Sequence, residues 1–228
     1  MGSISNFTLK SSHYDQKNKL DSLELLRFLG AMAVVIFHYN KITGTTHDDV
    51  LFPFYDNLKW FYIHGGSFVE AFFLISGFTF FYIYGDQIQL GKIGFKKFFC
   101  KRIVRLYPLY WYATILTLGT ALVTYLIFGC VMSGIGGSLR ILSIIPSVLG
   151  VNMVLWPTAY PFLGPAWTLG IEMLCYVIFY TEMKYVKSIV LQIICEIALI
   201  ATAAIIICCN INIPIFNTNV ARGVYCFF

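Results

Sequence analysis

The sequence predicts an all-α fold, a polytopic bundle of transmembrane helices with about five complete spans and one partial or re-entrant helix. Three observations lead to this prediction. Of the 228 residues, 58% are hydrophobic and only 12% are charged, and the mean hydropathy is +0.75. A soluble domain carries about twice this fraction of charge, and a core of this size cannot hide so much apolar surface. The apolar residues also gather in runs near the ~20 residues that cross a bilayer, so lipid is the expected solvent.

The composition also excludes several classes of protein. The net charge of +5 comes from few charged residues, which disfavours a disordered or nucleic-acid-binding chain. The seven cysteines lie in or beside apolar runs, without C-x-x-C or Cys/His ligand spacing. We therefore interpret them as small hydrophobic side chains, and we expect neither a disulfide framework nor a metal site.

The N-terminal 1–20 segment is polar, and we expect it to be a cytoplasmic tail that precedes a membrane domain over 21–228. It lacks the short hydrophobic core and small-residue cleavage site of a signal peptide. The first apolar run begins after Asp21, and Glu24 three residues later forms a variant of the capping box. A first helix is therefore predicted from Asp21 to about Tyr39.

Four further spans are expected where the apolar runs recur, at 66–84, 103–128, 165–181 and 189–209. The stretch 140–163 contains three prolines and is more ambiguous. It is either a sixth span or a re-entrant or interfacial helix, which is tolerated at membrane depth only where protein covers its loose backbone groups. Another apolar run begins at Gly223.

Basic residues set the expected orientation. The tail has three lysines and the segment 92–105 has six basic residues, so both are expected to face the cytoplasm. The intervening loop, 40–64, has two lysines against three aspartates and is expected outside. Lys184 and Lys187 favour the inside for the next small loop, which is satisfied if 140–163 does not cross completely.

Ionisable residues inside the expected spans are costly there and are therefore candidates for function. The candidates are Glu24, Arg27, His38, Glu70, Glu172 and Glu196. Arg27 and His38 share the first helix, about 20° apart in azimuth and about 16.5 Å apart along the axis, so one face carries both. Helix geometry alone leaves open a plainer interpretation, in which Arg27 only pairs with Glu24 and His38 only caps the outer end.

Four blocks of this sequence resemble those of acyltransferase family 3, the bacterial integral-membrane O-acyltransferases that act on surface carbohydrates. In order, they are LDSLELLRFLGAMAVVIFHY with its R-x10-H pattern, HGGSFVEAFFLISGF, FKKFFCKRIVRLYPLYW and PAWTLGIEMLCYVIFY. The last block has Thr168 where the family has serine in a W-S-L-x-x-E motif. The resemblance covers about residues 20–181, and ARGVYCFF at the end looks like the start of a later family helix.

The resemblance implies transfer of an acyl group, most often acetyl, from cytoplasmic acyl-CoA to a hydroxyl of a cell-surface glycan or its precursor. It implies a multi-pass protein of the bacterial cytoplasmic (inner) membrane with its N-terminus in the cytoplasm. The expected partners are acyl-CoA, a glycan or lipid-linked glycan acceptor and membrane lipids, with no nucleic acid and no bound cofactor besides the donor substrate. The family fold has about ten helices and needs well over ~300 residues, so we expect this chain to be its N-terminal portion.

The resemblance also implies roles for individual residues. His38 is expected to act as the general base or as an acyl acceptor, and Glu172 to bind the acceptor or orient His38. Arg27 is expected to bind a phosphate or the carbonyl of the donor, with Arg102 and Arg105 as further donor-binding residues. The positive-inside rule and anionic lipids explain a basic cluster equally well.

Two supporting residues and several alternatives complete the prediction. Glu70 is expected to hold Arg27 or His38 or to form a packed ion pair, and Ser76 and Gly77 to permit a close helix approach before any donor contact. A transporter or proton-relay subunit, a non-catalytic scaffold and an inactive truncated family member remain alternatives. We expect an interfacial aromatic belt to include Trp60, Tyr62, Tyr107, Tyr110, Trp111 and Trp156.

Overall fold

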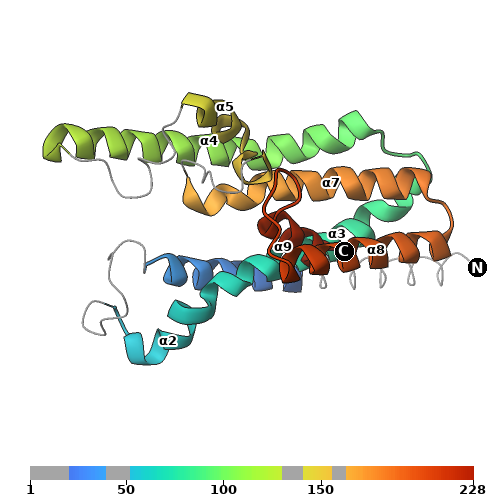
Figure 1. The fold of residues 1–228 in the computed structure, drawn as a ribbon, viewed down its shortest axis with the longest axis horizontal. Helices are drawn as coiled ribbons and strands as arrows, with labels where there is room; N and C mark the ends of the chain where they lie inside the picture. The colour runs from blue at the N-terminus through green and yellow to red at the C-terminus, as the bar shows by residue number, and fades with distance from the viewer. Residues whose placement is uncertain (1–20, 40–51, 130–140, 156–162) are drawn as a thin grey trace, which may run out of the picture. The chain divides into compact units, whose positions relative to one another are not determined.

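The computed structural model describes residues 21–39, 52–129, 141–155 and 163–228. All named elements in these ranges are helices, which confirms the all-α prediction (Figure 1). The chain divides into two compact units, 1–76 and 77–228, and each is described separately below.

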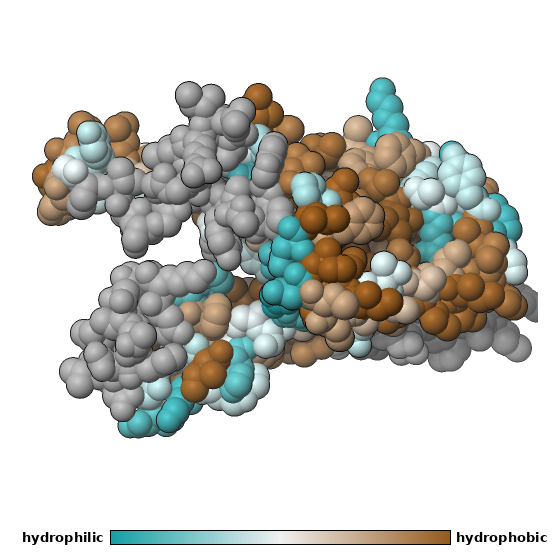
Figure 2. All heavy atoms as spheres, viewed as in Figure 1, coloured by the Kyte–Doolittle hydropathy of each residue, from teal (hydrophilic) through white to brown (hydrophobic). Residues whose placement is uncertain are grey.

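Four helices in the described ranges are long and apolar enough to cross a membrane: Asp21–Tyr39, Tyr55–Gln89, Phe95–Phe128 and Ile189–Cys208. At most 22% of the apolar window of any of them is buried, so these helices direct most of their apolar surface outward. Figure 2 shows this surface in brown. Ile193, Ile194 and Ile197 are exposed examples on Ile189–Cys208. Outward apolar side chains are what a lipid solvent favours, which supports the prediction of a multi-pass membrane protein.

The first unit contains the helix Asp21–Tyr39, α2 (Tyr55–His64), the 3-10 turn η2 (Gly65–Ser67) and the first turns of α3 (Phe68–Gln89). Residues Asp21–Tyr39 are helical, as predicted. The second half of the expected 40–64 loop is instead helical, since α2 continues through η2 into α3. Residues 40–51 lie outside the described residues.

Aromatic packing explains why α2 forms. Phe52, Tyr55 and Tyr62 are buried against one another, and the rings of Phe52 and Tyr62 are 4.9 Å apart. The Tyr62 hydroxyl donates a hydrogen bond of 3.1 Å to the Pro53 carbonyl oxygen. Aromatic pairs add to the free energy gained from burial, so this polar-looking segment gains enough to fold as a helix.

Glycines let the first helix approach the start of α3 closely. A Cβ on Gly65 would lie 2.5 Å from the Ala33 carbonyl oxygen, and one on Gly66 would lie 3.1 Å from the Phe37 ring. Small residues at such positions are typical of helix packing in membranes. The H-G-G sequence at the start of the second block therefore has a packing role.

The second unit contains the rest of α3, α4 (Phe95–Phe128), α5 (Ile141–Leu149), α6 (Asn152–Leu155), the 3-10 turn η3 (Gly164–Ala166), α7 (Trp167–Tyr185), α8 (Ile189–Cys208) and α9 (Thr218–Phe227). α4 begins eight residues before the span predicted at 103, so all the basic residues of segment 92–105 except Lys92 lie on its first turns. The span expected at 165–181 is helix α7, although it is not among the four apolar helices. Glu172, Glu182 and Lys184 interrupt its apolar run.

The described part of the ambiguous stretch, residues 141–155, forms two short helices. α5 has nine residues and therefore rises about 13.5 Å, less than half the ~30 Å of a bilayer core. The chain turns at Gly150, with φ 70°, before α6 begins. Both short helices fit the predicted partial helix, while residues 156–162 lie outside the described residues.

Three side chains of α4 cover the C-terminal carbonyl groups of α5. Tyr107 donates a hydrogen bond of 2.8 Å to the Leu149 oxygen, and Trp111 Nε1 donates one of 3.0 Å to the Val148 oxygen. Tyr110 donates to the Ser147 oxygen. The last carbonyls of a helix have no partner within the helix, so these contacts supply the protein cover that a partial helix needs.

Candidate functional site

The His38 side chain is half-buried near the end of the first helix. Its Nδ1 atom lies 2.8 Å from the carbonyl oxygen of Val34, one turn earlier. A carbonyl oxygen can only accept, so this contact assigns the proton to Nδ1. In the neutral ring Nε2 then keeps its lone pair, which is the form that a general base requires.

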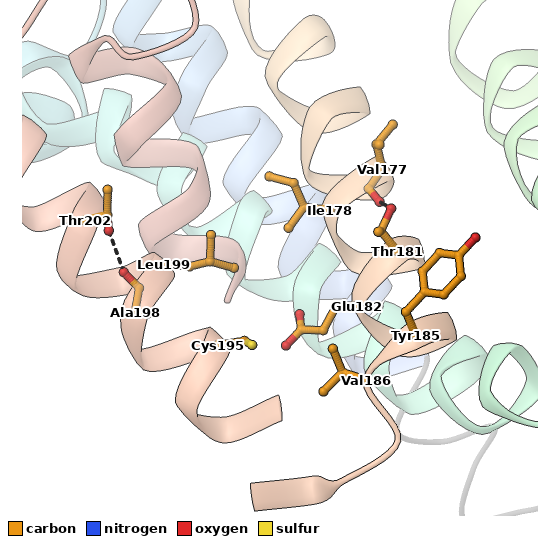
Figure 3. A pocket seen from close by; sticks show the side chains of 10 residues that line it. All are labelled: Val177, Ile178, Thr181, Glu182, Tyr185, Val186, Cys195, Ala198, Leu199 and Thr202. Atoms are coloured by element: carbon orange, nitrogen blue, oxygen red, sulfur yellow. Dashed lines mark hydrogen bonds between the residues drawn. The ribbon is translucent and has the colours of Figure 1, made fainter. Parts of the chain in front are cut away.

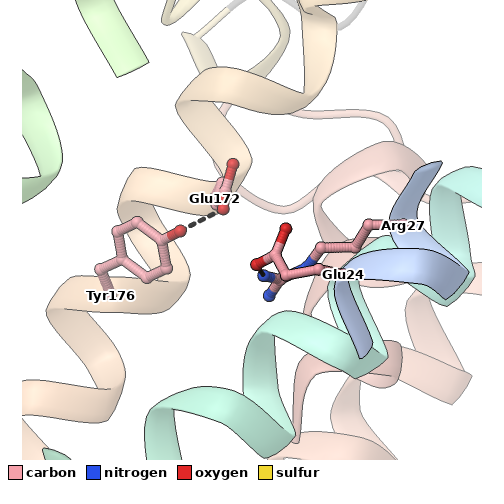
Figure 4. A network of polar contacts seen from close by, with 4 residues as sticks. All are labelled: Glu24, Arg27, Glu172 and Tyr176. Atoms are coloured by element: carbon pink, nitrogen blue, oxygen red, sulfur yellow. Dashed lines mark hydrogen bonds and ion pairs between the residues drawn. The ribbon is translucent and has the colours of Figure 1, made fainter. Parts of the chain in front are cut away.

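Arg27 lies on the same continuous helix and forms an ion pair of 2.7 Å with Glu24 (Figure 4). The Arg27 side chain is 22% exposed and that of Glu24 is 62% exposed. The pairing that helix geometry left open is therefore present. Solvent-exposed pairs contribute only ~0.2–1 kcal/mol, so such a pair does not by itself commit Arg27 to a structural role.

The two supporting residues predicted from the sequence both lie on α3. Glu70 is half-buried in the first turn of α3. Ser76 is also half-buried and directly precedes Gly77, where a Cβ would lie only 1.9 Å from the Phe227 carbonyl oxygen of α9. Of the two residues at which a close helix approach was expected, Ser76 and Gly77, the glycine makes it.

The predicted site residues fall into both compact units. Arg27, His38 and Glu70 belong to residues 1–76, whereas Arg102 and Glu172 belong to 77–228 together with Arg105.

Glu172 on α7 is held by a tyrosine that sequence analysis did not single out. The Tyr176 hydroxyl, one helical turn later, donates a hydrogen bond to Glu172 Oε1 (Figure 4). Tyr176 is only 3% exposed, and its ring stacks on Phe80 of α3 at 4.3 Å between centroids. The signal in the sequence was the i,i+4 spacing within WTLGIEMLCY, because residues four apart share one face of a helix.

Arg102 on α4 is buried in an aromatic enclosure. Its guanidinium carbon lies 4.5 Å from the ring centroid of Phe80, 4.7 Å from that of Tyr84 and 5.7 Å from that of Phe98. A desolvated cation over aromatic faces gains ~2 kcal/mol or more. The side chain is 6% exposed and its Nε atom has no hydrogen-bond partner. Arg105, one turn later, is exposed.

Phe80 connects the two polar groups of the second unit, since its ring contacts both the Tyr176 ring and the Arg102 guanidinium. The unit therefore holds an oriented carboxyl group and a fixed cation on a shared aromatic support. In a water-poor environment a fixed cation stabilises a nearby anion or a developing oxyanion more strongly than it does in water.

Arg222 on α9 is a further charged residue that sequence analysis did not select. Its guanidinium carbon lies 5.7 Å from the Trp167 ring at the start of α7. Asn217 fixes this helix, because its Oδ1 accepts from the Val220 amide at 3.0 Å and its Nδ2 donates to the Met153 carbonyl at 2.9 Å. Among the residues that the structure describes, no group of three or more His, Cys, Asp or Glu side chains could hold a metal ion.

Comparison with known proteins gives one positive result. The model of the acyltransferase domain matches residues 20–228, which is nearly the whole chain. The searches of curated proteins and of solved structures found no match.

Proposed function

The chain belongs to acyltransferase family 3, and on this basis we propose that it transfers an acyl group, most often acetyl, from cytoplasmic acyl-CoA to a hydroxyl of a cell-surface glycan or its precursor. Membership of the family and the apolar helices make it a multi-pass membrane acyltransferase. The donor, the acceptor, the bacterial inner membrane and the cytoplasmic N-terminus are parts of the proposal.

The hydrogen bond between His38 Nδ1 and the Val34 carbonyl carries the proposed mechanism. Nε2 takes the proton from the acceptor hydroxyl as its oxygen attacks the thioester carbonyl carbon. The carbon–sulfur bond of the tetrahedral intermediate then breaks, and the imidazolium returns the proton to the departing CoA thiolate. In a two-step variant, Nε2 attacks the thioester carbon and the carbon–sulfur bond breaks, so that CoA leaves as its thiolate. The acceptor hydroxyl then attacks the acyl-imidazolium, the carbon–nitrogen bond breaks, and the hydroxyl proton passes to the thiolate.

In this proposal each of the three arginines binds a different part of the acyl-CoA donor or acts at a different stage of the reaction. Arg105 is exposed and suits the hydrated phosphates of CoA, whereas Arg102 is buried and suits the thioester oxygen as it gains negative charge. When the donor binds, Arg27 breaks its ion pair with Glu24 and instead binds a phosphate or the carbonyl of the donor. Glu172, oriented by Tyr176, accepts a hydrogen bond from the acceptor hydroxyl.

The first test follows acyl transfer in cells and membranes. Glycan mass spectrometry with and without the gene detects the acyl increment, and membranes given radiolabelled acetyl-CoA report the transfer rate. His38→Ala should reduce the rate ~10²–10⁴-fold, the usual contribution of a general base. His13→Ala, in the polar tail, serves as the matched control. Full transfer by His38→Ala would refute the proposed role of His38.

The second test concerns the donor. Arg27→Ala should weaken acetyl-CoA binding, measured by equilibrium binding to the purified full chain, because a charge-assisted contact is lost. Glu24→Gln removes the competing carboxylate and should leave donor binding unchanged or tighter. If Arg27→Ala leaves both donor affinity and turnover unchanged, Arg27 does not bind the donor.

A further inference from the structure

A groove of about 580 Å³ lies between α7 and α8 (Figure 3). Its walls are formed by side chains of α7, the residue after it and α8: Val177, Ile178, Thr181, Glu182, Tyr185, Val186, Cys195, Ala198, Leu199 and Thr202. Glu172 is ten residues from Glu182 along α7, which places the two carboxyl groups about 80° apart around the helix axis. The groove is therefore separate from the Glu172–Tyr176 pair.

The walls of the groove are apolar. The threonine hydroxyls are already used, because Thr181 donates to the Val177 carbonyl oxygen and Thr202 to the Ala198 carbonyl oxygen, each at 2.7 Å. Both threonines follow a pattern in which the hydroxyl returns to the preceding turn of its own helix. An alkyl chain therefore finds methyl and methylene groups along most of the groove.

Glu182 is the exception. Its side chain points into the groove (Figure 3), the residue is only 6% exposed, and neither carboxyl oxygen has a hydrogen-bond partner. The two lysines nearest in sequence do not donate to Glu182. Lys187 donates to the Gln89 carbonyl at 2.8 Å, and Lys184 Nζ lies 5.8 Å from the ring centroid of Tyr180 and 5.3 Å from that of Tyr185. Burying a carboxyl group without a hydrogen-bond donor costs free energy. A ligand in the groove that donates a hydrogen bond to Glu182 would remove this cost.

The position of Glu182 along α7 suggests the layout of that ligand. It lies three residues, or about 4.5 Å, before the helix ends at Tyr185, next to the loop to α8. From there the apolar walls extend about 7.5 Å to Val177 on α7. On the other side of the groove, α8 is the most apolar of the four candidate membrane spans in the described residues. The groove therefore has a polar end near the end of a helix and an apolar end at the depth of the lipid hydrocarbon. A membrane lipid has the same arrangement of a polar headgroup and an apolar chain.

We propose that this groove binds one membrane lipid with a primary ammonium headgroup. The ammonium donates a hydrogen bond to the Glu182 carboxyl group, and one acyl chain lies against Ile178 and Leu199. The carboxylate of Glu196, next to Cys195 on α8, acts electrostatically on Glu182 and adds to the negative potential that favours a cation. A choline headgroup lacks the N–H donor and does not satisfy Glu182.

Cys195 provides a reporter inside the groove. The full chain is reconstituted in vesicles of phosphatidylcholine, with or without phosphatidylethanolamine, and treated with a membrane-permeant maleimide. Mass spectrometry of peptides measures the alkylation rate at each cysteine. Phosphatidylethanolamine should slow alkylation of Cys195 several-fold and leave the exposed Cys208, on the same helix, unchanged. Glu182→Gln should abolish the difference between the two lipids.

The outcomes separate the possible occupants. Equal rates of Cys195 alkylation in the two vesicles would overturn the proposal, whether the groove is open or is covered by a protein helix. Protection that persists in Glu182→Gln would also overturn it, since a general effect of phosphatidylethanolamine on the bilayer would then be responsible. The comparison of lipids on the unmodified chain needs no variant to fold, and the assay needs no acyl-CoA, so its result is independent of the proposed acyl transfer.

Discussion

Gly77→Ala tests the close contact between α3 and α9. A Cβ at this position would lie 1.9 Å from the Phe227 carbonyl oxygen and 2.8 Å from its carbonyl carbon, whereas ordinary contacts begin at 3.4 Å. α9 would therefore have to withdraw by about 1.5 Å. The opposing atoms are backbone atoms, so no side-chain rotation can relieve the clash. Overpacking usually costs ~1–3 kcal/mol, and we expect a loss of free energy of unfolding at the upper end of this range.

The displacement should also reach the candidate site. Phe227 packs against Phe80 and Tyr176, with ring centroids 6.0 and 6.1 Å away. These are the rings that support Arg102 and orient Glu172. Gly77→Ala should therefore lower acyl transfer in addition to stability.

The assay is unfolding of the purified full chain in mixed micelles by increasing SDS, followed by circular dichroism. Gly85→Ala is the matched control on the same helix, because its Cβ would meet only the Met183 sulfur at an ordinary 3.8 Å. An alanine there should be neutral or stabilise by up to ~1 kcal/mol, as expected from helix propensity. If Gly77→Ala unfolded at the same SDS fraction as Gly85→Ala, the inferred contact between α3 and α9 would be wrong.

Three further predictions concern the second unit. Tyr176→Phe keeps the ring on Phe80 but removes the donor to Glu172, so it should cost about 1–3 kcal/mol and change the pH profile of acyl transfer; an unchanged profile would exclude a positioning role. Arg102→Lys replaces a planar cation by a compact, strongly hydrated one, and should lower stability by about 1 kcal/mol in SDS unfolding, while Arg105→Lys, at an exposed position, should not. Trp111→Phe should free the Val148 carbonyl and raise hydrogen exchange of the α5 amides, at a cost of ~0.5–1.5 kcal/mol.

The features that the sequence predicts well are encoded locally. The first helix is predicted correctly over Asp21–Tyr39 because its apolar run is contiguous in the sequence. The pairing of Glu24 with Arg27 follows from their three-residue spacing on that helix. Membership of the acyltransferase family follows in the same way, because the motif blocks are short segments read one after another.

The features that the sequence predicts poorly depend on contacts between distant segments. Tyr107 and Trp111 fit an interfacial aromatic belt by composition, yet they donate hydrogen bonds to carbonyls of α5, about 40 residues later. The sequence predicts a loop where α2 forms, because the polar residues of this segment are visible in the sequence and the aromatic contacts that stabilise the helix are not. The pattern of charged and polar residues predicts which side chains prefer contact with water. It does not predict which groups of the protein form hydrogen bonds with those side chains in the folded state.

Arg102 and Arg105 show the same limit at the candidate site. They are three residues apart in one basic segment, and positive-inside reasoning treats them alike. Three residues along a helix rotate the side chain by about 300°, so the two arginines lie about 60° apart around α4. This rotation, with the rings of Phe80 and Tyr84 on α3, leaves Arg102 at 6% exposure while Arg105 stays exposed. A buried, stacked guanidinium is already desolvated and oriented before any ligand arrives, whereas an exposed one must be ordered by the ligand. Under the proposed function, Arg102 is therefore assigned to the charge that develops during acyl transfer, and Arg105 to the charge that acyl-CoA already has.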